Sequence, residues 1–145
     1  MNRLLFFLFT FSILFLGCNS NNLDDYDRIK LFLTKHNFSG NLDDFNEIIV
    51  INDKGDCIQC NNDYAKFISK KKADTKIIFI ISQDGTKVDI SPFLENSNKE
   101  NIIFDYKDEF SLLNIIKGSG VIKLQDNQIK ETFIVTPQNI QDILN

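Results

Sequence analysis

The stretch from Glu47 to Lys72, EIIVINDKGDCIQCNNDYAKFISKKK, decides how the rest of this 145-residue sequence is interpreted. An apolar run, Ile48 to Ile51, ends at a polar turn, Asn52 to Asp56, and a C-x-x-C pair, Cys57 and Cys60, then opens a segment with helical period. A helix N-terminus presents unpaired N–H groups and a positive partial charge, both of which stabilise a thiolate. Cysteines three apart on a helix lie on one face, close enough to form a disulfide. The stretch therefore predicts a strand, a turn and a helix that together carry a dithiol redox site.

The composition is that of one soluble globular domain with enough chain for a single core. Hydrophobic residues make up 43% of the sequence and charged residues 25%, which is ordinary for this class. The net charge is -4 and the pI about 4.9, which argues against an extended nucleic-acid surface.

The first seventeen residues, 1–17, have the pattern of a targeting segment and are excluded from the fold. Arg3 supplies the basic start, and Leu4 to Leu16 is an uninterrupted, mainly apolar core. That core is shorter than the roughly 20 residues of a spanning helix, so we expect a cleaved signal peptide instead of a transmembrane anchor.

The segment ends in Leu14-Phe15-Leu16-Gly17-Cys18, which resembles the lipobox of bacterial lipoproteins. The resemblance implies that Cys18 is lipidated and becomes the first residue after cleavage, with 18–22 as the lipidated N-terminus and a short linker. We then expect a protein of the bacterial cell envelope, tethered by lipid on the periplasmic side or at the cell surface. The alternative is an ordinary secretory signal followed by an incidental cysteine.

Lipidation of Cys18 would determine how many cysteines remain to form a disulfide. The chain has three cysteines, so a lipidated Cys18 leaves Cys57 and Cys60 as the one remaining pair. Export also places this pair in a compartment where disulfides persist.

The domain, 23–145, shows alternating helical and strand patterns. Two apolar runs without polar alternation flank the cysteine helix, which predicts a βαβ unit with parallel strands. Asp126 and Asn127 predict a tight turn between two antiparallel strands. We expect a first helix over 23–37, with Tyr26, Ile29, Phe32 and Leu33 on its inner face, and a second over 57–72, with Asn61, Asn62, Asp63 and Lys66 mostly outside. Further helices are expected over 91–96, after a cap at Asp108 with Phe110, Leu113 and Ile116 on one face, and from Thr136 to the end. The expected strands cover 48–51, 76–82, 102–104, 121–124 and 129–135.

This order of elements, over residues 44–145, resembles the thioredoxin fold in the variant with an insertion that TlpA-like membrane-tethered thioredoxins and peroxiredoxins share. The resemblance implies an α/β three-layer sandwich, in which a central mixed sheet with two C-terminal antiparallel strands lies between helices. It also implies that Cys57 is the exposed attacking thiol and Cys60 the buried resolving thiol. The family's substrate-binding cis-proline corresponds here to Gly118 or Ser119.

The chain departs from the family at two positions around the cysteine pair. Neither Gly118 nor Ser119 is a proline, and Ile51 stands where thioredoxins carry a buried carboxylate. The residues between the cysteines, Ile58 and Gln59, add no charge, so thiolate stabilisation depends mostly on the helix N-terminus. We therefore expect a reducing pair, not a strongly oxidising one.

The function predicted from these residues is a membrane-tethered thiol-disulfide oxidoreductase that acts on exported proteins through Cys57 and Cys60. We expect it to receive electrons from an upstream redox donor and to need no metal and no cofactor beyond its own disulfide. Two alternatives remain open at this point. The disulfide could be structural in a non-catalytic lipoprotein that serves as a binding module, or the thiols could bind metal, as in a copper chaperone with His36 as a third ligand. For His36 itself, the simpler interpretation is a role at the end of its helix, where a positive charge suits the dipole.

Overall fold

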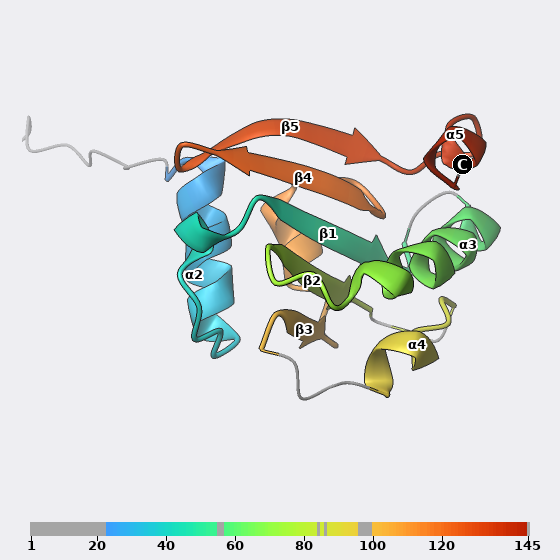
Figure 1. The fold of residues 1–145 in the computed structure, drawn as a ribbon, viewed down its shortest axis with the longest axis horizontal. Helices are drawn as coiled ribbons and strands as arrows, with labels where there is room; N and C mark the ends of the chain where they lie inside the picture. The colour runs from blue at the N-terminus through green and yellow to red at the C-terminus, as the bar shows by residue number, and fades with distance from the viewer. Residues whose placement is uncertain (1–22, 55–56, 84, 86, 96–99, 145) are drawn as a thin grey trace, which may run out of the picture.

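The computed structural model describes residues 23–54, 57–83, 85, 87–95 and 100–144, and a five-stranded mixed sheet forms its centre (Figure 1). The predicted signal peptide and lipidation site lie outside these residues. The helices are α2 (Asp25–Lys35), α3 (Ile58–Ile68), α4 (Ser91–Leu94) and α5 (Ile140–Leu144), with 3-10 turns η1 (Leu42–Asp44), η2 (Ser69–Lys71) and η3 (Phe110–Leu113). The strands are β1 (Glu47–Asn52), β2 (Ile77–Ser82), β3 (Ile102–Asp105), β4 (Gly120–Gln125) and β5 (Gln128–Ile134).

The strands lie in the order β3-β2-β1-β4-β5, which places β1 at the centre of the sheet. The pairs β1–β2 and β2–β3 are parallel, whereas β4 runs antiparallel to both β1 and β5. The predicted parallel βαβ unit around the cysteine helix is thus confirmed. Because the carboxyl ends of β1, β2 and β3 meet at one edge, the residues that follow them come together there.

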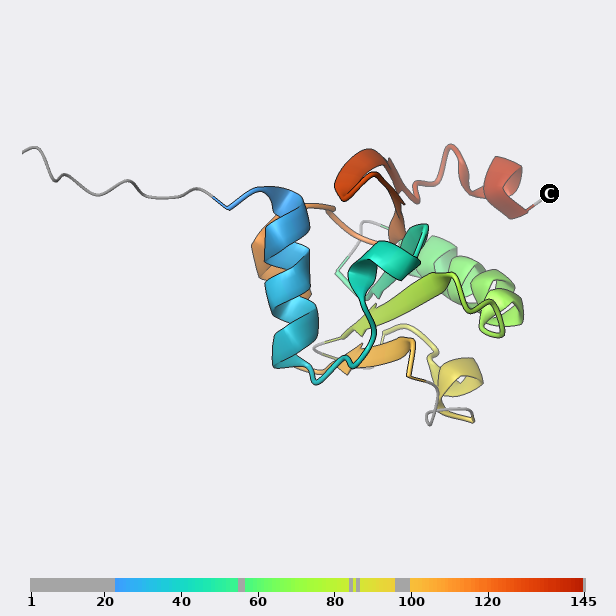
Figure 2. The same ribbon diagram turned by 60° about the vertical axis from the view of Figure 1, so that its left-hand side comes forward.

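The two faces of the sheet bury separate apolar clusters, because successive residues of a strand point to opposite sides. On β1, Ile49 and Ile51 pack against α3 and α5, whereas Ile48 and Val50 pack against α2 and η3. Both views show α2 and α3 on opposite sides of the sheet (Figures 1 and 2). The molecule is therefore a mixed α/β sandwich with helices on both faces of the sheet. Within the described ranges, no helix is long and apolar enough to cross a membrane.

The first helix and the last hairpin confirm two predictions from the sequence. Asp24 caps α2 by accepting a hydrogen bond from the Asp27 N–H, and the four predicted inner residues of the helix are buried. Asp126 and Asn127 both have positive φ, 52° and 59°, as a type I′ hairpin turn requires.

The predicted helix after Asp108 is wrong in length and in its cap. Only the 3-10 turn η3 forms, and it ends at Asn114, which has a left-handed backbone. Asp108 itself has φ 53°, and its carboxylate accepts side-chain hydrogen bonds from Asn52 and Ser82 of the sheet and from Ser111 of η3, so it does not cap the backbone of the turn. The N–H of Phe110 is bound by the Asp105 carboxylate, which fixes the segment in its short form.

Two further differences concern α3 and the terminal helix. Asn61 was expected outside but is buried, and α3 packs against α5 as well as against the sheet. The terminal helix has regular α-helical geometry only from Ile140. The turn before it begins at Thr136, the predicted start of the helix, where Thr136 and Asn139 exchange side-chain to backbone hydrogen bonds of 2.8 and 3.3 Å.

Candidate functional site

The two cysteines of the C-x-x-C pair form a disulfide at the start of α3. Their Cα atoms are 5.2 Å apart. Cys57 is the N-cap of the helix, and its Sγ accepts a hydrogen bond of 3.1 Å from the Cys60 N–H. The disulfide thus lies where the first turn of an eleven-residue helix presents N–H groups and positive partial charge.

The two sulfur-bearing residues differ in exposure. Cys60 is 6% exposed and belongs to the core on the α3 face, whereas Cys57 is half-buried at the edge of that core. Ile58, next to it, leaves 47% of its surface open to solvent. An incoming sulfur atom can therefore reach Cys57 more readily than Cys60.

A row of polar residues crosses the sheet at the edge where the cysteine helix begins. Asn52, Ser82 and Asp105 are the last residues of the three parallel strands, and they are in register with one another. Ser82 Oγ lies 2.9 Å from Asp105 Oδ2, and all three side chains are buried. Buried polar groups need such partners, so the row forms a polar layer under the loops at this edge.

Asp108 joins this row to the loop that leads to the cysteines. Its Oδ1 accepts hydrogen bonds from the side chains of Asn52, Ser82 and Ser111. Its Oδ2 lies 2.5 Å from Nζ of Lys54, and the Lys54 N–H donates to Asn52 Oδ1 at 2.6 Å. Burial acts to raise the pKa of Asp108, but the hydrogen bonds from Lys54, Ser111 and Ser82 outweigh it and hold the pKa below its ordinary value. Asp108 is therefore an anion in the folded protein at neutral pH.

Ser119, one of the two residues predicted to bind substrate, is tied to β1. Its Oγ accepts from the Asn52 N–H at 2.9 Å and donates to the Asn52 carbonyl at 3.1 Å. The ladder between β1 and β4 ends at the pair Val50 and Gly120, so the Ser119 hydroxyl continues it by one step. Gly118, the other predicted residue, is partly exposed and has φ 109°, which favours glycine.

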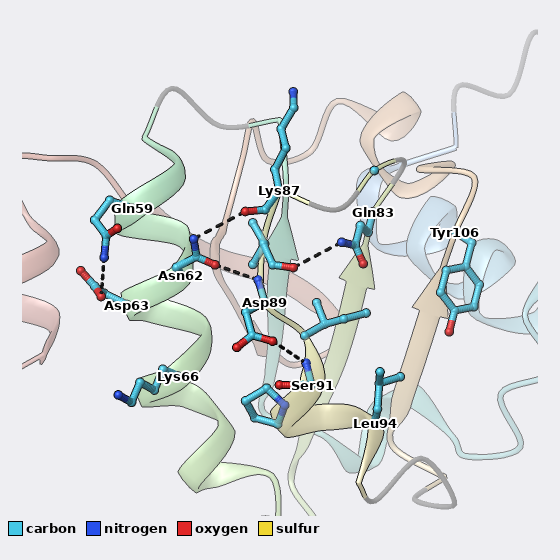
Figure 3. Close-up of a pocket in the computed structure, with 14 residues that line it drawn as sticks. Gln59, Asn62, Asp63, Lys66, Gln83, Lys87, Asp89, Ser91, Leu94 and Tyr106 are labelled. Carbon is cyan, nitrogen blue, oxygen red and sulfur yellow. Dashed lines mark hydrogen bonds between the residues drawn. The ribbon is translucent and has the colours of Figure 1, made fainter.

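A groove of about 1010 Å³ lies between α3 and the segment 87–94 (Figure 3). Gln59, which sits between the two cysteines, lines it and donates a hydrogen bond of 3.0 Å to Asp63. The Asn62 side chain bridges the two walls, because it accepts from the Asp89 N–H at 2.7 Å and donates to the Lys87 carbonyl. The groove thus begins beside the disulfide.

His36 lies on the other side of the sheet from the cysteine pair. It ends α2, its ring is tilted by 33° against the ring of Phe32 in the opposite core, and its Nε2 lies 3.5 Å from Glu109. No group of three or more potential metal-binding side chains occurs among the residues that the structure describes. The structure therefore does not bring His36 together with Cys57 and Cys60.

No protein-family model, curated protein or solved structure matches this chain.

Interpretation of the sequence missed the polar layer that surrounds Asn52 and Asp108. No partner was predicted from the sequence for Asn52, Ser82, Lys54 or Asp105. One signal was present in the sequence. Each of the three apolar runs that form β1, β2 and β3 ends in a short polar residue, and parallel strands bring such residues together.

Proposed function

We propose that this protein is a thioredoxin-like thiol-disulfide oxidoreductase, which reduces or exchanges disulfides in exported proteins through Cys57 and Cys60. The observation that carries the proposal is the disulfide at the N-terminus of α3, with one half-buried and one buried sulfur. A disulfide in so small a loop, beside a helix N-terminus, is placed where a thiolate is stabilised after reduction.

The arrangement of the sheet supports a thioredoxin-like fold. The cysteine pair follows the central strand β1, its helix crosses to the parallel neighbour β2, and the chain ends in an antiparallel hairpin and a helix. The short helix α4 and the edge strand β3 fill the place of the insertion that the sequence suggested. These features belong to the order of elements on which the resemblance to the thioredoxin fold rests.

The proposed reaction has two steps. In the reduced protein, the Cys57 thiolate attacks one sulfur of a substrate disulfide, so that a mixed disulfide forms and one substrate thiolate leaves and takes up a proton. The Cys60 thiol then loses its proton, attacks Cys57 Sγ and releases the second substrate thiol. Two electrons have passed to the substrate, and the Cys57–Cys60 disulfide must be reduced again by an upstream dithiol protein.

The Cys60 N–H is the group that supports the first step. It already lies 3.1 Å from Cys57 Sγ in the oxidised protein, and a hydrogen bond to a charged acceptor is stronger than one to a neutral sulfur. The N–H therefore stabilises the thiolate more than the disulfide.

The proposal includes a lipid tether at Cys18, which rests on the sequence pattern alone. The described domain begins a few residues later with α2, so a tethered domain would stay close to the membrane surface. A radiolabelled or mass-tagged acyl chain on Cys18, lost in Cys18→Ser, tests this part of the proposal separately from the redox chemistry.

Reductase activity and partner capture test the redox proposal. We expect the reduced protein to reduce the interchain disulfides of insulin, and we expect Cys57→Ser to be inactive. Cys60→Ser should retain exported proteins as mixed disulfides on Cys57, and Cys57→Ser is the matched control that should retain none. A wild-type protein without activity, together with an empty Cys60→Ser trap, would favour the binding module with a structural disulfide.

A further inference from the structure

The Lys54–Asp108 ion pair links the cysteine loop to the buried polar layer. Lys54 lies three residues before Cys57, and its side chain is 52% exposed, whereas the Asp108 side chain is 2% exposed. Their Nζ and Oδ2 atoms are 2.5 Å apart. The pair therefore joins a lysine on the surface of the loop to an anion fixed inside the fold.

The two ions of the pair differ in exposure, since the Asp108 side chain is buried and the Lys54 side chain is half-exposed. Three side-chain hydrogen bonds fix the Asp108 carboxylate from the sheet and from η3. The Lys54 side chain has four rotatable methylene carbons, and its backbone is fixed by the bond from its N–H to Asn52. Any change of partner between the two ions therefore falls to the Lys54 ammonium.

Cys57 is close to Lys54 in sequence, which limits the distance that the ammonium would have to cover. Two residues three apart in sequence cannot have Cα atoms more than about 11 Å apart, and a lysine side chain spans most of the remaining distance to a cysteine sulfur. A lysine beside a cysteine lowers the pKa of the thiol, because the ammonium stabilises the thiolate. In the oxidised protein the Cys57 sulfur is neutral, so it does not attract the Lys54 ammonium away from the Asp108 carboxylate.

We propose that Lys54 is the cation that stabilises the Cys57 thiolate, and that Asp108 competes for it and so sets how reactive the reduced pair is. This inference rests on the proposed exchange reaction, in which the Cys57 thiolate attacks. In the oxidised protein Lys54 pairs with Asp108. On reduction the new thiolate shares the ammonium with Asp108, so the thiolate gains less than it would from a lysine without a competing anion.

The other charges that line the groove beside the pair are exposed or held by their own partners. Asp63 accepts from Gln59, and Asp89 accepts from the Ser91 N–H at 3.0 Å. Lys66 and Lys87 lie on the exposed walls of the groove. These four charges balance. Asp53 precedes Lys54 in the loop and is 4% exposed, and the buried Asp105 accepts from the Ser82 hydroxyl and the Phe110 N–H; neither carboxylate is changed in the variants compared below.

The test measures the pKa of Cys57 in the reduced full-length protein, purified in detergent. The rate of alkylation by iodoacetamide is followed from pH 4 to 10, and peptide mass spectrometry confirms that Cys57 is the residue modified. Asp108→Asn keeps the side-chain shape, keeps an oxygen for the three hydrogen bonds and suits the left-handed backbone at this position. It removes the charge that competes for Lys54 and replaces the Oδ2 acceptor that faces the ammonium with an amide nitrogen.

We expect Asp108→Asn to lower the pKa of Cys57 by about one unit. The thiolate fraction near pH 6, and with it the rate of alkylation, should then rise about tenfold. Lys54→Met should raise the pKa, and in the Lys54→Met background Asp108→Asn should change the rate by less than about threefold. An equal effect of Asp108→Asn in both backgrounds would show that Asp108 acts directly and would overturn the inference. So would an unchanged pKa in Asp108→Asn.

Two controls keep the outcome clear. Lys123→Met and Glu131→Gln remove an exposed ion pair on β4 and β5 and should leave the pKa of Cys57 unchanged. If Asp108→Asn does not fold, Lys54→Met decides alone, since a pKa no higher than that of Lys66→Met contradicts the inference. A protein that shows the pKa shift but does not reduce insulin contradicts the proposed function only, and an active protein without the shift contradicts the inference only.

Discussion

Ser119→Ala should destabilise the protein strongly for a single hydroxyl group. The Ser119 Oγ satisfies both the N–H and the carbonyl of Asn52, at 2.9 and 3.1 Å, and the side chain is 1% exposed. Alanine leaves two buried backbone groups without these partners. Each such group costs about 1 to 3 kcal/mol, so we expect a loss of about 3 kcal/mol in the free energy of unfolding. That is a large fraction of the roughly 5–15 kcal/mol of a typical domain.

The assay is urea unfolding of the oxidised protein, followed by circular dichroism. The urea midpoint should fall. The slope m should stay the same, because unfolding exposes the same amount of surface in the variant as in the wild type. Ser69→Ala is the matched control, since its hydroxyl donates to the Lys66 carbonyl at an exposed position. We expect the control to lose less than about 1 kcal/mol. A Ser119→Ala loss no larger than that of the control would refute the role of this hydroxyl in completing β1.

Three further predictions follow from buried contacts. The lowered pKa of Asp108 means that its charge contributes stability above about pH 4, the usual pKa of an unfolded aspartate. This contribution is lost as the pH falls toward the lower pKa of the folded state. In urea unfolding, the difference in the free energy of unfolding between wild type and Asp108→Asn should therefore shrink from pH 5 to pH 2. Tyr64→Phe removes a fully buried hydroxyl that donates to the Gly120 carbonyl at 3.1 Å, so it should cost about 1 to 2 kcal/mol in the same assay, and an unchanged midpoint would contradict this. Gly120→Ala would place a Cβ 1.9 Å from the Phe133 carbonyl oxygen, so β4 and β5 would have to separate; we expect a loss above about 3 kcal/mol or failure to fold, and a stable variant would show that the hairpin is less close than described.

The elements that depend on local pattern were predictable from the sequence. The spacing of Tyr26, Ile29, Phe32 and Leu33 predicts α2, because a helix of 3.6 residues per turn places them on one face. Asp126 and Asn127 predict the hairpin through their tolerance of positive φ. Hydrophobic period and turn chemistry are read from neighbouring residues, so one sequence is sufficient for them.

The polar layer was not predictable in the same way, because it depends on contacts between distant segments. Asn52, Ser82, Asp108 and Ser119 come from four parts of the chain, and each alone is an ordinary polar residue at a strand end or in a turn. The same contacts explain why η3 is short, since Asp108 is drawn toward the sheet instead of capping a helix. Apart from the short polar residue at the end of each parallel strand, local sequence does not indicate which residues will be partners.

The cysteine site was likewise predictable only in part. The strand, the turn and the cysteine helix were predicted from 47–72, and the structure adds the half-buried and buried positions of the two sulfurs. The groove beside Gln59 and the ion pair at Lys54 need the fold before they can be recognised.

The redox potential of the Cys57–Cys60 pair tests the central proposal most directly. The protein is equilibrated in thiol–disulfide buffers of defined potential, and the fraction of reduced protein is measured from the mass added by a thiol-blocking reagent, with Cys57→Ser as the control. We predict a reversible two-electron transition at a potential above about −300 mV, the upper limit typical of structural disulfides. A disulfide that stays oxidised in buffers well below that potential would contradict the proposed exchange reaction.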